Sequence, residues 1–202
     1  AMDKSVEQIK KEYINIFNAN IKREGADKLL DYLQNGCDFF VSPASGRRHS
    51  NFDGGLAYHS IMVYNRFKKN IQNEYGANYA DFLSDESIAL IALLHDICKV
   101  GSYVKDLKNQ KVNGQWVQVP YYAYNQNNSL PFGHGEKSVY MISSFVHLTR
   151  EEAVCINWHM GGFDPRAQQG DDLTQAYLQY PNALLFHISD YEATYIDEEI
   201  IK

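Results

Sequence analysis

Apolar residues recur at helical spacing along most of the chain. This spacing predicts a first helix over 5–21, a second over 26–34, and a third that begins near Leu56 and carries His59 in its first turn. The stretch 37–55, between the second and third helices, contains one proline and three glycines and has few periodic positions. It therefore predicts an ordered loop that leads into the third helix.

The strongest apolar run lies over 88–94. Ser84 suits an N-cap for this helix, and the two residues that follow it are acidic, as the first turn of a helix prefers. The run is followed at once by His95 and Asp96, so two ionisable side chains emerge at the end of a buried helix. Burial of such groups is costly unless they are paired or bind a metal ion.

The second half of the chain mixes helical patterns with one strand pattern. Asn113-Gly114 lies between two short alternating runs and predicts a β-hairpin within 103–124. The other predicted elements are a helix over 136–146, a helix from a Thr149–Glu152 capping box to about His159, a polar loop over 164–172, and a buried helix over 182–196. We therefore expect an all-α fold with a small inserted β-hairpin, in a single domain over 1–202.

Composition and charge narrow the class of protein. With 202 residues and 45% hydrophobic residues, the chain is long enough for one domain with a sizeable core. Its net charge of −6 argues against a protein that binds long nucleic acid duplexes through a broad basic surface. No run approaches the roughly 20 apolar residues that span a bilayer, and the first residues lack the apolar core of a signal peptide. We expect a cytoplasmic protein without a membrane partner, and its three cysteines, which form no CxxC pair, fit reduced thiols.

Histidines and aspartates near the ends of the predicted helices form a candidate metal site. Imidazole and carboxylate ligands suit iron, manganese or zinc, and the absence of thiolate from the set argues against a structural zinc finger. We expect two divalent metal ions, with the choice among Mn, Fe and Zn left open, because the carboxylate of Asp96 has two oxygens and can bridge ions ~3.5–4 Å apart. The candidate ligands are His59, His95, Asp96, His134, His159 and Asp190.

The competing interpretation treats each histidine separately. Any one of them is more often a hydrogen-bonded core or surface residue than a metal ligand. The set as a whole favours a metal site, because its four histidines all lie near predicted helix ends beside glycine or polar residues. His147 and His187 lack this setting, and we interpret them as structural residues, with His187 placed one turn before Asp190 to support it.

The candidate ligands follow a recognisable order: a lone histidine (His59), a His-Asp pair (His95-Asp96), two further histidines (His134, His159) and a distal aspartate (Asp190). This order resembles the motif of the HD-domain superfamily of metal-dependent phosphohydrolases, and the two extra histidines resemble its dinuclear branch, which includes cyclic-dinucleotide phosphodiesterases. The resemblance implies an HD-domain helical bundle, with N-terminal helices over 1–36 and a metal-binding core over 37–196.

The loop before the third helix carries a second resemblance. Lys99 matches the basic residue found three positions after the motif aspartate, whereas Cys98 stands where the family pattern usually has glycine. The loop itself is similar to the HD domain of a bacterial 3′-to-5′ exoribonuclease family at Pro43-Ala44-Ser45, Arg48-His49, Phe52, Gly54-Gly55-Leu56 and His59-Ser60. This second resemblance points to nucleotide chemistry.

The resemblance implies a metal-dependent phosphohydrolase. Its substrate would be a phosphomonoester or phosphodiester of a small nucleotide, a cyclic dinucleotide or a short oligonucleotide, cleaved by attack of a metal-bridging hydroxide. Asp96 would bridge and orient the ions, and Lys99 would neutralise charge in the transition state. The residues expected to contact the substrate are Arg48, His49, Lys99 and Tyr122. For Arg48, a solvated surface residue is an equally good interpretation.

Two other functions share these ligands. Some HD-fold proteins that resemble this pattern are di-iron oxygenases acting on a polyol or a phosphonate, and Lys99 suits such substrates as well. A metal-bound nucleotide sensor without turnover is the third hypothesis, and the intact ligand set counts against it. The oligomeric state is left open.

Overall fold

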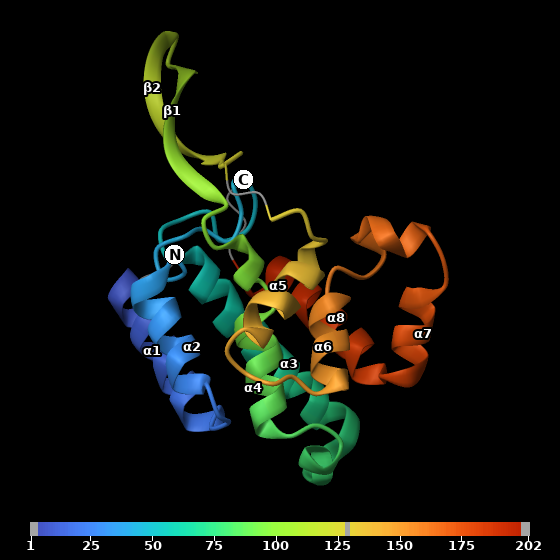
Figure 1. Ribbon diagram of the computed structural model, residues 1–202. Coiled ribbons are helices and arrows are strands. Elements are labelled where there is room, and N and C mark those ends of the chain that lie inside the picture. The colour runs from blue at the N-terminus through green and yellow to red at the C-terminus, as the bar shows by residue number, and fades with distance from the viewer. Residues whose placement is uncertain (1–3, 128–129, 199–202) are drawn as a thin grey trace.

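The computed structural model describes residues 4–127 and 130–198. Within these residues the chain is mostly helical, with one two-stranded antiparallel sheet (Figure 1). No described helix is both long enough and apolar enough to cross a lipid bilayer. The elements are α1 (Val6–Asn20), α2 (Ala26–Asp31), α3 (Gly55–Tyr75), α4 (Asp85–Leu94), β1 (Tyr103–Val112), β2 (Gln115–Tyr124), α5 (His134–Ser143), α6 (Arg150–Asn157), α7 (Asp172–Gln179) and α8 (Pro181–Glu192).

Helix α4 lies at the centre of the hydrophobic core. Every residue over 88–94 is buried, and the helix packs against α1, α3 and α6. It begins where the sequence predicts, because the hydroxyl of Ser84 accepts a hydrogen bond from the Ser87 amide at 3.1 Å. A helix buried on all sides is fixed by its neighbours, so the residues at its end are held in place as well.

Capping boxes begin two other helices, and the second of the two was predicted from the sequence. The capping box of Ser5 and Gln8 begins α1, and that of Thr149 and Glu152 begins α6. The second helix is shorter than the predicted range 26–34. Helix α2 ends at Asp31, and a π-helical turn follows it over 32–36.

The helices of the second half differ from the prediction in two places. Helix α5 begins at His134, two residues before the predicted start. Helix α7 follows the predicted polar loop and shares only Asp172 with it, and it was not predicted, although Ala176, Tyr177 and Tyr180 follow helical spacing.

The predicted β-hairpin is confirmed. Strands β1 and β2 pair in register from Tyr103↔Tyr124 to Val112↔Gln115. The turn uses Asn113 and Gly114 with φ of 49° and 85°, which are the left-handed values that a two-residue type I′ turn requires. The hairpin extends away from the helical body (Figure 1), so it forms an arm rather than a layer of the core.

A buried ion pair ties the start of α6 to the connection between α1 and α2. The guanidinium of Arg23 donates to both carboxylate oxygens of Glu152 at 2.8 Å each, and the Ser87 hydroxyl donates to the same carboxylate at 2.7 Å. The Glu152 side chain is fully buried. Burial opposes its ionisation, but hydrogen bonds from Arg23 and Ser87 outweigh this and lower the pKa of the carboxyl.

We expect Arg23→Ala to destabilise the protein by about 3–5 kcal/mol at pH 7, because it leaves the Glu152 carboxylate buried without its partner. The loss should shrink as the pH falls below about 5, since the unpaired Glu152 carboxyl of the variant is protonated first, whereas the lowered pKa of Glu152 keeps the wild-type ion pair until lower pH. Urea unfolding at pH 7 and pH 4 would measure both effects. Arg150→Ala, at an exposed arginine of α6, is the control and should change the free energy of unfolding by less than about 0.5 kcal/mol. An Arg23→Ala loss no larger than that of the control would contradict the prediction.

Candidate metal centre

The structure brings all six predicted ligand residues together around the carboxylate of Asp96. Its Oδ2 lies 3.4 Å from Nε2 of His59 and 3.4 Å from Nε2 of His95. Its Oδ1 lies 2.8 Å from Nε2 of His134 and 3.4 Å from Nε2 of His159. Asp190 completes the cluster, with its Oδ1 3.3 Å from Nε2 of His59. These buried imidazole and carboxylate groups can hold a metal ion.

The end of α4 positions the central pair of the cluster. His95 is the C-cap of α4, and Asp96 follows it outside helical geometry, at φ −103° and ψ 15°. The hydroxyl of Tyr13, on α1, donates to the Leu93 carbonyl at 2.8 Å and so satisfies a carbonyl at the helix end. The sequence change from an apolar run to His-Asp therefore coincides with the point where the chain leaves the core helix.

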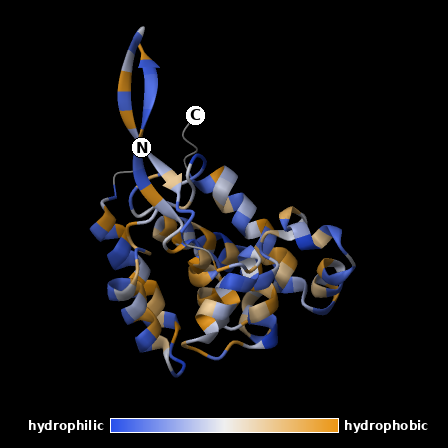
Figure 2. Ribbon diagram, turned by 45° about the horizontal axis from the view of Figure 1, so that its top comes forward, coloured by the Kyte–Doolittle hydropathy of each residue, from blue (hydrophilic) through white to orange (hydrophobic). Residues whose placement is uncertain are grey.

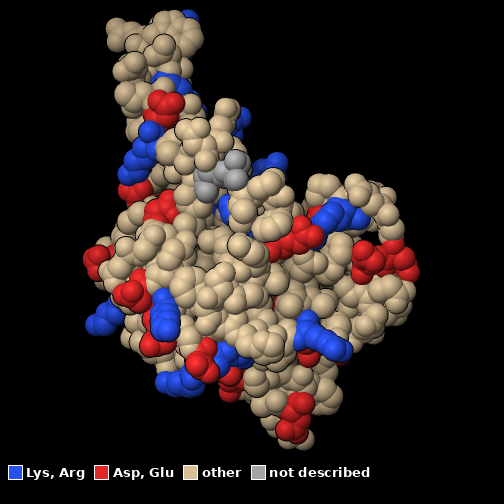
Figure 3. Space-filling view, viewed as in Figure 1, with Lys and Arg blue, Asp and Glu red and all other residues tan. Residues whose placement is uncertain are grey.

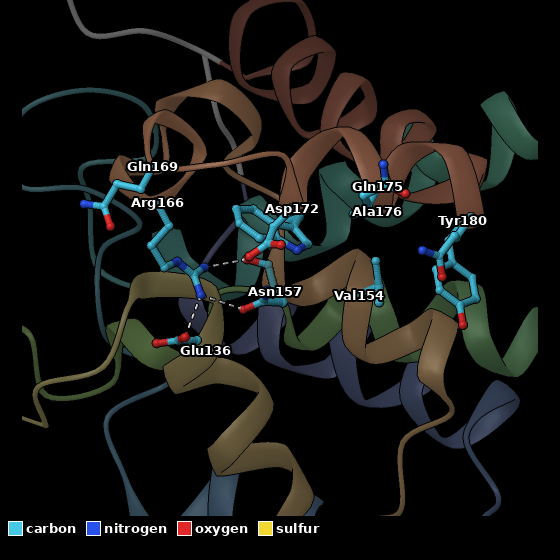
Figure 4. A pocket seen from close by; sticks show the side chains of 11 residues that line it. Glu136, Val154, Asn157, Arg166, Gln169, Asp172, Gln175, Ala176 and Tyr180 are labelled. Atoms are coloured by element: carbon cyan, nitrogen blue, oxygen red, sulfur yellow. Dashed lines mark hydrogen bonds and ion pairs between the residues drawn. The ribbon is translucent and has the colours of Figure 1, made fainter.

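Close packing of α5 against α6 brings His134 and His159 together. A side chain at Gly135 would place its Cβ 2.1 Å from the Asn157 carbonyl oxygen, so the approach of these two helices requires glycine there. Arg166 stabilises the same contact between α5 and α6, because it donates a hydrogen bond to the Asn157 side chain at 3.1 Å and forms an ion pair with Glu136 at 2.7 Å (Figure 4). One arginine thus links the start of the helix that carries His134 to the end of the helix that precedes His159.

Hydrogen bonds at the far side of three imidazole rings determine which nitrogen faces Asp96. Nδ1 of His95 donates to the Ala92 carbonyl at 2.8 Å, and Nδ1 of His159 donates to the Ile156 carbonyl at 2.7 Å. A carbonyl only accepts, so Nδ1 carries the proton, and Nε2 of the neutral ring presents its lone pair to the cluster. Nδ1 of His59 lies 2.6 Å from Oε1 of Glu198, which favours the same tautomer.

His159 provides a direct test of whether these residues fit a metal ion. Its Nε2 is buried and has no hydrogen-bond partner among the described residues. A buried polar nitrogen without a partner is costly, and a lone pair held in this way is what a metal ligand presents. The donor set and this unsatisfied nitrogen both fit a metal ion.

The charges of the cluster balance one another. Burial opposes ionisation of Asp96, but Lys99 and the neighbouring imidazoles outweigh it and hold the pKa of the carboxyl well below its usual range. Burial also opposes protonation of His59, yet Glu198, Asp190 and Asp96 raise the pKa of that imidazole. The carboxylates therefore stay ionised at neutral pH, and a bound cation would replace protons on the imidazoles.

A cavity of about 170 Å³ opens onto the cluster. Three of the four residues expected to contact substrate, Arg48, His49 and Lys99, line it together with His59, Asp96, His134 and Asp190. Nζ of Lys99 lies 2.6 Å from Oδ2 of Asp96, inside the site. The fourth, Tyr122, lies outside this cavity, where its hydroxyl donates to Asp53 at the base of the hairpin.

Glu198 is a site residue that the sequence analysis did not identify. Besides contacting His59, its buried carboxylate accepts a hydrogen bond from the Ser50 hydroxyl. Glu198 follows the last helical turn and lies 139 positions from His59, so no local spacing links the two residues. The only signal in the sequence is the presence of acidic residues after the final helix.

The two histidines interpreted as structural residues lie outside the cluster. His147 is exposed. Nδ1 of His187 donates to the carbonyl of His159 at 2.7 Å, so His187 supports the backbone of His159 rather than the side chain of Asp190.

Comparison of the chain with models of protein families, with curated proteins and with solved structures gave no significant match.

We expect Asp96→Asn to abolish metal binding, because it removes the charge that all four imidazoles share. Elemental mass spectrometry after dialysis against Mn²⁺ should find metal in the wild type and less than a tenth of that amount in the variant. Mn²⁺ should also raise Tm of the wild type but not of the variant, since a ligand at 100 times its Kd stabilises the folded state by about 2.7 kcal/mol.

His147→Ala is the matched control for this experiment, because it removes an imidazole outside the cluster. It should retain the wild-type metal content and the wild-type rise in Tm. Full metal content in Asp96→Asn would contradict the assignment of the cluster as a metal centre.

Proposed function

We propose that this protein is a metal-dependent phosphohydrolase of the HD-domain type that binds two divalent ions. The observation that carries the proposal is the division of the cluster by Asp96. One carboxylate oxygen faces His59 and His95, and the other faces His134 and His159. A carboxylate shared in this way between two groups of nitrogen ligands supports a dinuclear site.

The ligands divide into two nearly equal sets. His59 and His95 supply one set, and His134 and His159 supply the other, with Asp96 common to both, while Asp190 lies within reach of His95 and His159 and of His59. Each ion would have at least three protein ligands of nitrogen or oxygen type, which leaves room for water and for a substrate oxygen. When bound, such ions supply Lewis acidity and lower the pKa of a coordinated water towards 7.

Lys99 is the group best placed to stabilise charge on a phosphoryl oxygen. Burial opposes its protonation, but the adjacent Asp96 carboxylate outweighs this and raises the pKa of the ammonium. The side chain is therefore charged at neutral pH and lines the cavity. A preorganised ammonium in a site that excludes most water stabilises developing negative charge more strongly than it would in bulk solvent.

Arg48 and His49 lie at the same cavity and would bind the substrate, and His49 also forms, with His59 and Glu198, a group that could hold a metal ion. Arg48 is exposed and can donate two hydrogen bonds to a phosphate. Burial and the neighbouring His59 and Lys99 lower the pKa of His49 to about 4, so its ring is neutral at neutral pH. A neutral ring fits a hydrogen-bonding role toward the substrate better than the role of a proton donor.

The size of the cavity limits what enters it. At about 170 Å³ it is smaller than the roughly 300–1,000 Å³ of most small-molecule pockets, so it suits a phosphoryl group rather than a whole nucleotide. The rest of the substrate would lie outside, where loop 37–55 and the hairpin approach the site. Small size also suits a polyol or a phosphonate, so a di-iron oxygenase is the second candidate function.

We expect Lys99→Met to slow phosphate ester hydrolysis by about 10²–10³ in kcat while leaving metal content unchanged, because it removes one stabilising donor but no ligand. Steady-state kinetics with a generic phosphodiester and Mn²⁺ would measure this loss. Lys69→Ala, which removes an exposed lysine from α3, is the control and should keep the wild-type rate. A wild-type kcat in Lys99→Met would exclude this lysine from the catalytic groups.

The proposed function itself is tested by metal content measured together with a panel of substrates. The panel should contain a generic diester, nucleoside monophosphates, cyclic dinucleotides and short RNA, each with Mn²⁺ and with Fe²⁺. Two ions per chain and release of phosphate or a nucleotide are the expected results, and both should be lost in Asp96→Asn. Two irons, no ester cleavage and oxygen uptake with a polyol or phosphonate would instead identify the oxygenase.

A further inference from the structure

The hairpin exposes apolar side chains that the helical body does not cover. Trp116 is 71% exposed, Tyr124 67% and Leu107 56%. Hydrophobic and hydrophilic residues alternate along the arm (Figure 2), as in a strand with two different faces. A two-stranded hairpin alone is marginally stable in water, and clustered exposed apolar groups mark interaction sites. The arm therefore has the character of a binding element.

Every lysine of the hairpin lies beside an aromatic ring. Lysines occur at every third position of β1, and the register of the two strands places an aromatic residue directly across from two of them. The third lies 5.5 Å from the centre of a tyrosine ring. The pairs are Lys105 with Tyr122, Lys108 with Tyr121, and Lys111 with Trp116. A single nucleic acid strand can use both kinds of group, because its phosphates pair with lysines and its bases stack on aromatic rings.

A pocket of about 570 Å³ lies at the root of the arm. Its volume falls within the roughly 300–1,000 Å³ typical of small-molecule sites, which is enough for a nucleotide unit. Asp53 holds one wall in place, because it pairs with Lys105 at 2.7 Å and accepts the Tyr122 hydroxyl. The pocket is lined by Gly46, Arg47, Asn51, Lys105, Lys108, Pro120, Tyr121 and Tyr122.

This root pocket borders the metal cavity. Arg47 lines the root pocket and Arg48 lines the metal cavity, and adjacent Cα atoms are only ~3.8 Å apart. Arg47 forms no ion pair with residues 4–127 or 130–198, so its charge is available to a ligand. One flexible chain of phosphates can therefore contact both sites at once.

The positive charge of the arm favours a negatively charged ligand. Three lysines and one aspartate give 103–124 a net charge of +2, in a chain whose net charge is −6. Figure 3 shows basic side chains on the arm. Two copies of the chain that paired arm against arm would bring these like charges together, which disfavours such a dimer.

We propose that the hairpin and its root pocket bind single-stranded nucleic acid and guide a phosphodiester of that strand into the metal cavity. Binding to the arm is independent of the chemistry, whereas delivery to the cavity rests on the proposed phosphohydrolase function. The strand would stack one base on Tyr121 beside Lys108, pass around the narrow arm to stack another on Trp116 of the opposite face, and place a phosphate against Arg47 at the root. Stacking on exposed rings requires bases that are not already paired in a duplex, so the preference for single strands follows from the rings of the arm.

The test is fluorescence anisotropy with fluorescein-labelled U12 RNA and with a duplex of equal length, in EDTA so that nothing is cleaved. We expect the wild type to bind U12 more tightly than the duplex. Trp116→Ala should weaken binding roughly tenfold, as expected for loss of one stacked base. Lys108→Ala should weaken it severalfold and make the slope of log K against log salt shallower by about 0.7, the contribution of one phosphate contact on a single strand.

Two controls remove a lysine and an aromatic ring from other parts of the surface. Lys28→Ala removes an exposed lysine from α2, and Tyr140→Ala removes a ring that is 56% exposed on α5. Both should bind U12 like the wild type. All four positions are exposed, so circular dichroism and Tm should show that the variants fold normally.

Failure of the inference can be separated from failure of the proposed function. Wild-type U12 affinity in both Lys108→Ala and Trp116→Ala would overturn the inference, even if the protein cleaves a generic diester. A Trp116→Ala variant that changes from dimer to monomer in analytical ultracentrifugation but keeps its U12 affinity would assign the arm to a second copy of the chain. U12 binding that depends on the arm, in a protein that cleaves no ester, would support the inference and remove the phosphohydrolase.

Discussion

The buried carboxylate of Asp96 is the group on which the rest of the site depends. A carboxylate in the interior is tolerated only when both oxygens have charged or hydrogen-bonding partners. Here the ammonium of Lys99 lies 2.6 Å from Oδ2 and Nε2 of His134 lies 2.8 Å from Oδ1, while His59, His95 and His159 face the same carboxylate at 3.4 Å. Residues from α3, from the start of α5 and from the segment after α6 therefore converge on one residue, and the position of that residue is fixed because it follows a helix whose residues over 87–94 are all buried.

That convergence explains contacts that would otherwise look like ordinary packing. Tyr13 satisfies a carbonyl near the end of α4, and Gly135 lets α5 approach the end of α6. Arg166 connects the same two helices through Glu136 and Asn157. None of these residues faces the cavity, yet each holds a helix end that carries or adjoins a ligand residue. Because a displacement of about 1 Å at a ligand is large on the scale of metal coordination, we regard these contacts as part of the site.

The sequence predicted those features that depend on local chemistry. Caps at Ser84 and Thr149, and the Asn113-Gly114 turn, are decided by a few neighbouring residues, and the structure confirms them. The convergence of the six ligands was also predictable, since buried histidines and aspartates at helix ends have few other partners. Glu198 could not be predicted, because its contact with His59 joins residues 139 positions apart. Helix α7 was missed because its polar composition concealed a helical spacing of apolar residues.

The proposed function and the proposed binding arm would divide chemistry from recognition. The metal cavity is small and lined by groups suited to one phosphoryl group, so it has no room to distinguish one base from another. The root pocket is more than three times larger and has rings and cations, but its lining contains no histidine, cysteine or carboxylate. Stacking on tyrosine and tryptophan accepts any base, because each base has an aromatic face. A protein arranged in this way would select its substrate by strandedness and charge rather than by sequence, and the adjacency of Arg47 and Arg48 would connect that selection to the reacting phosphate.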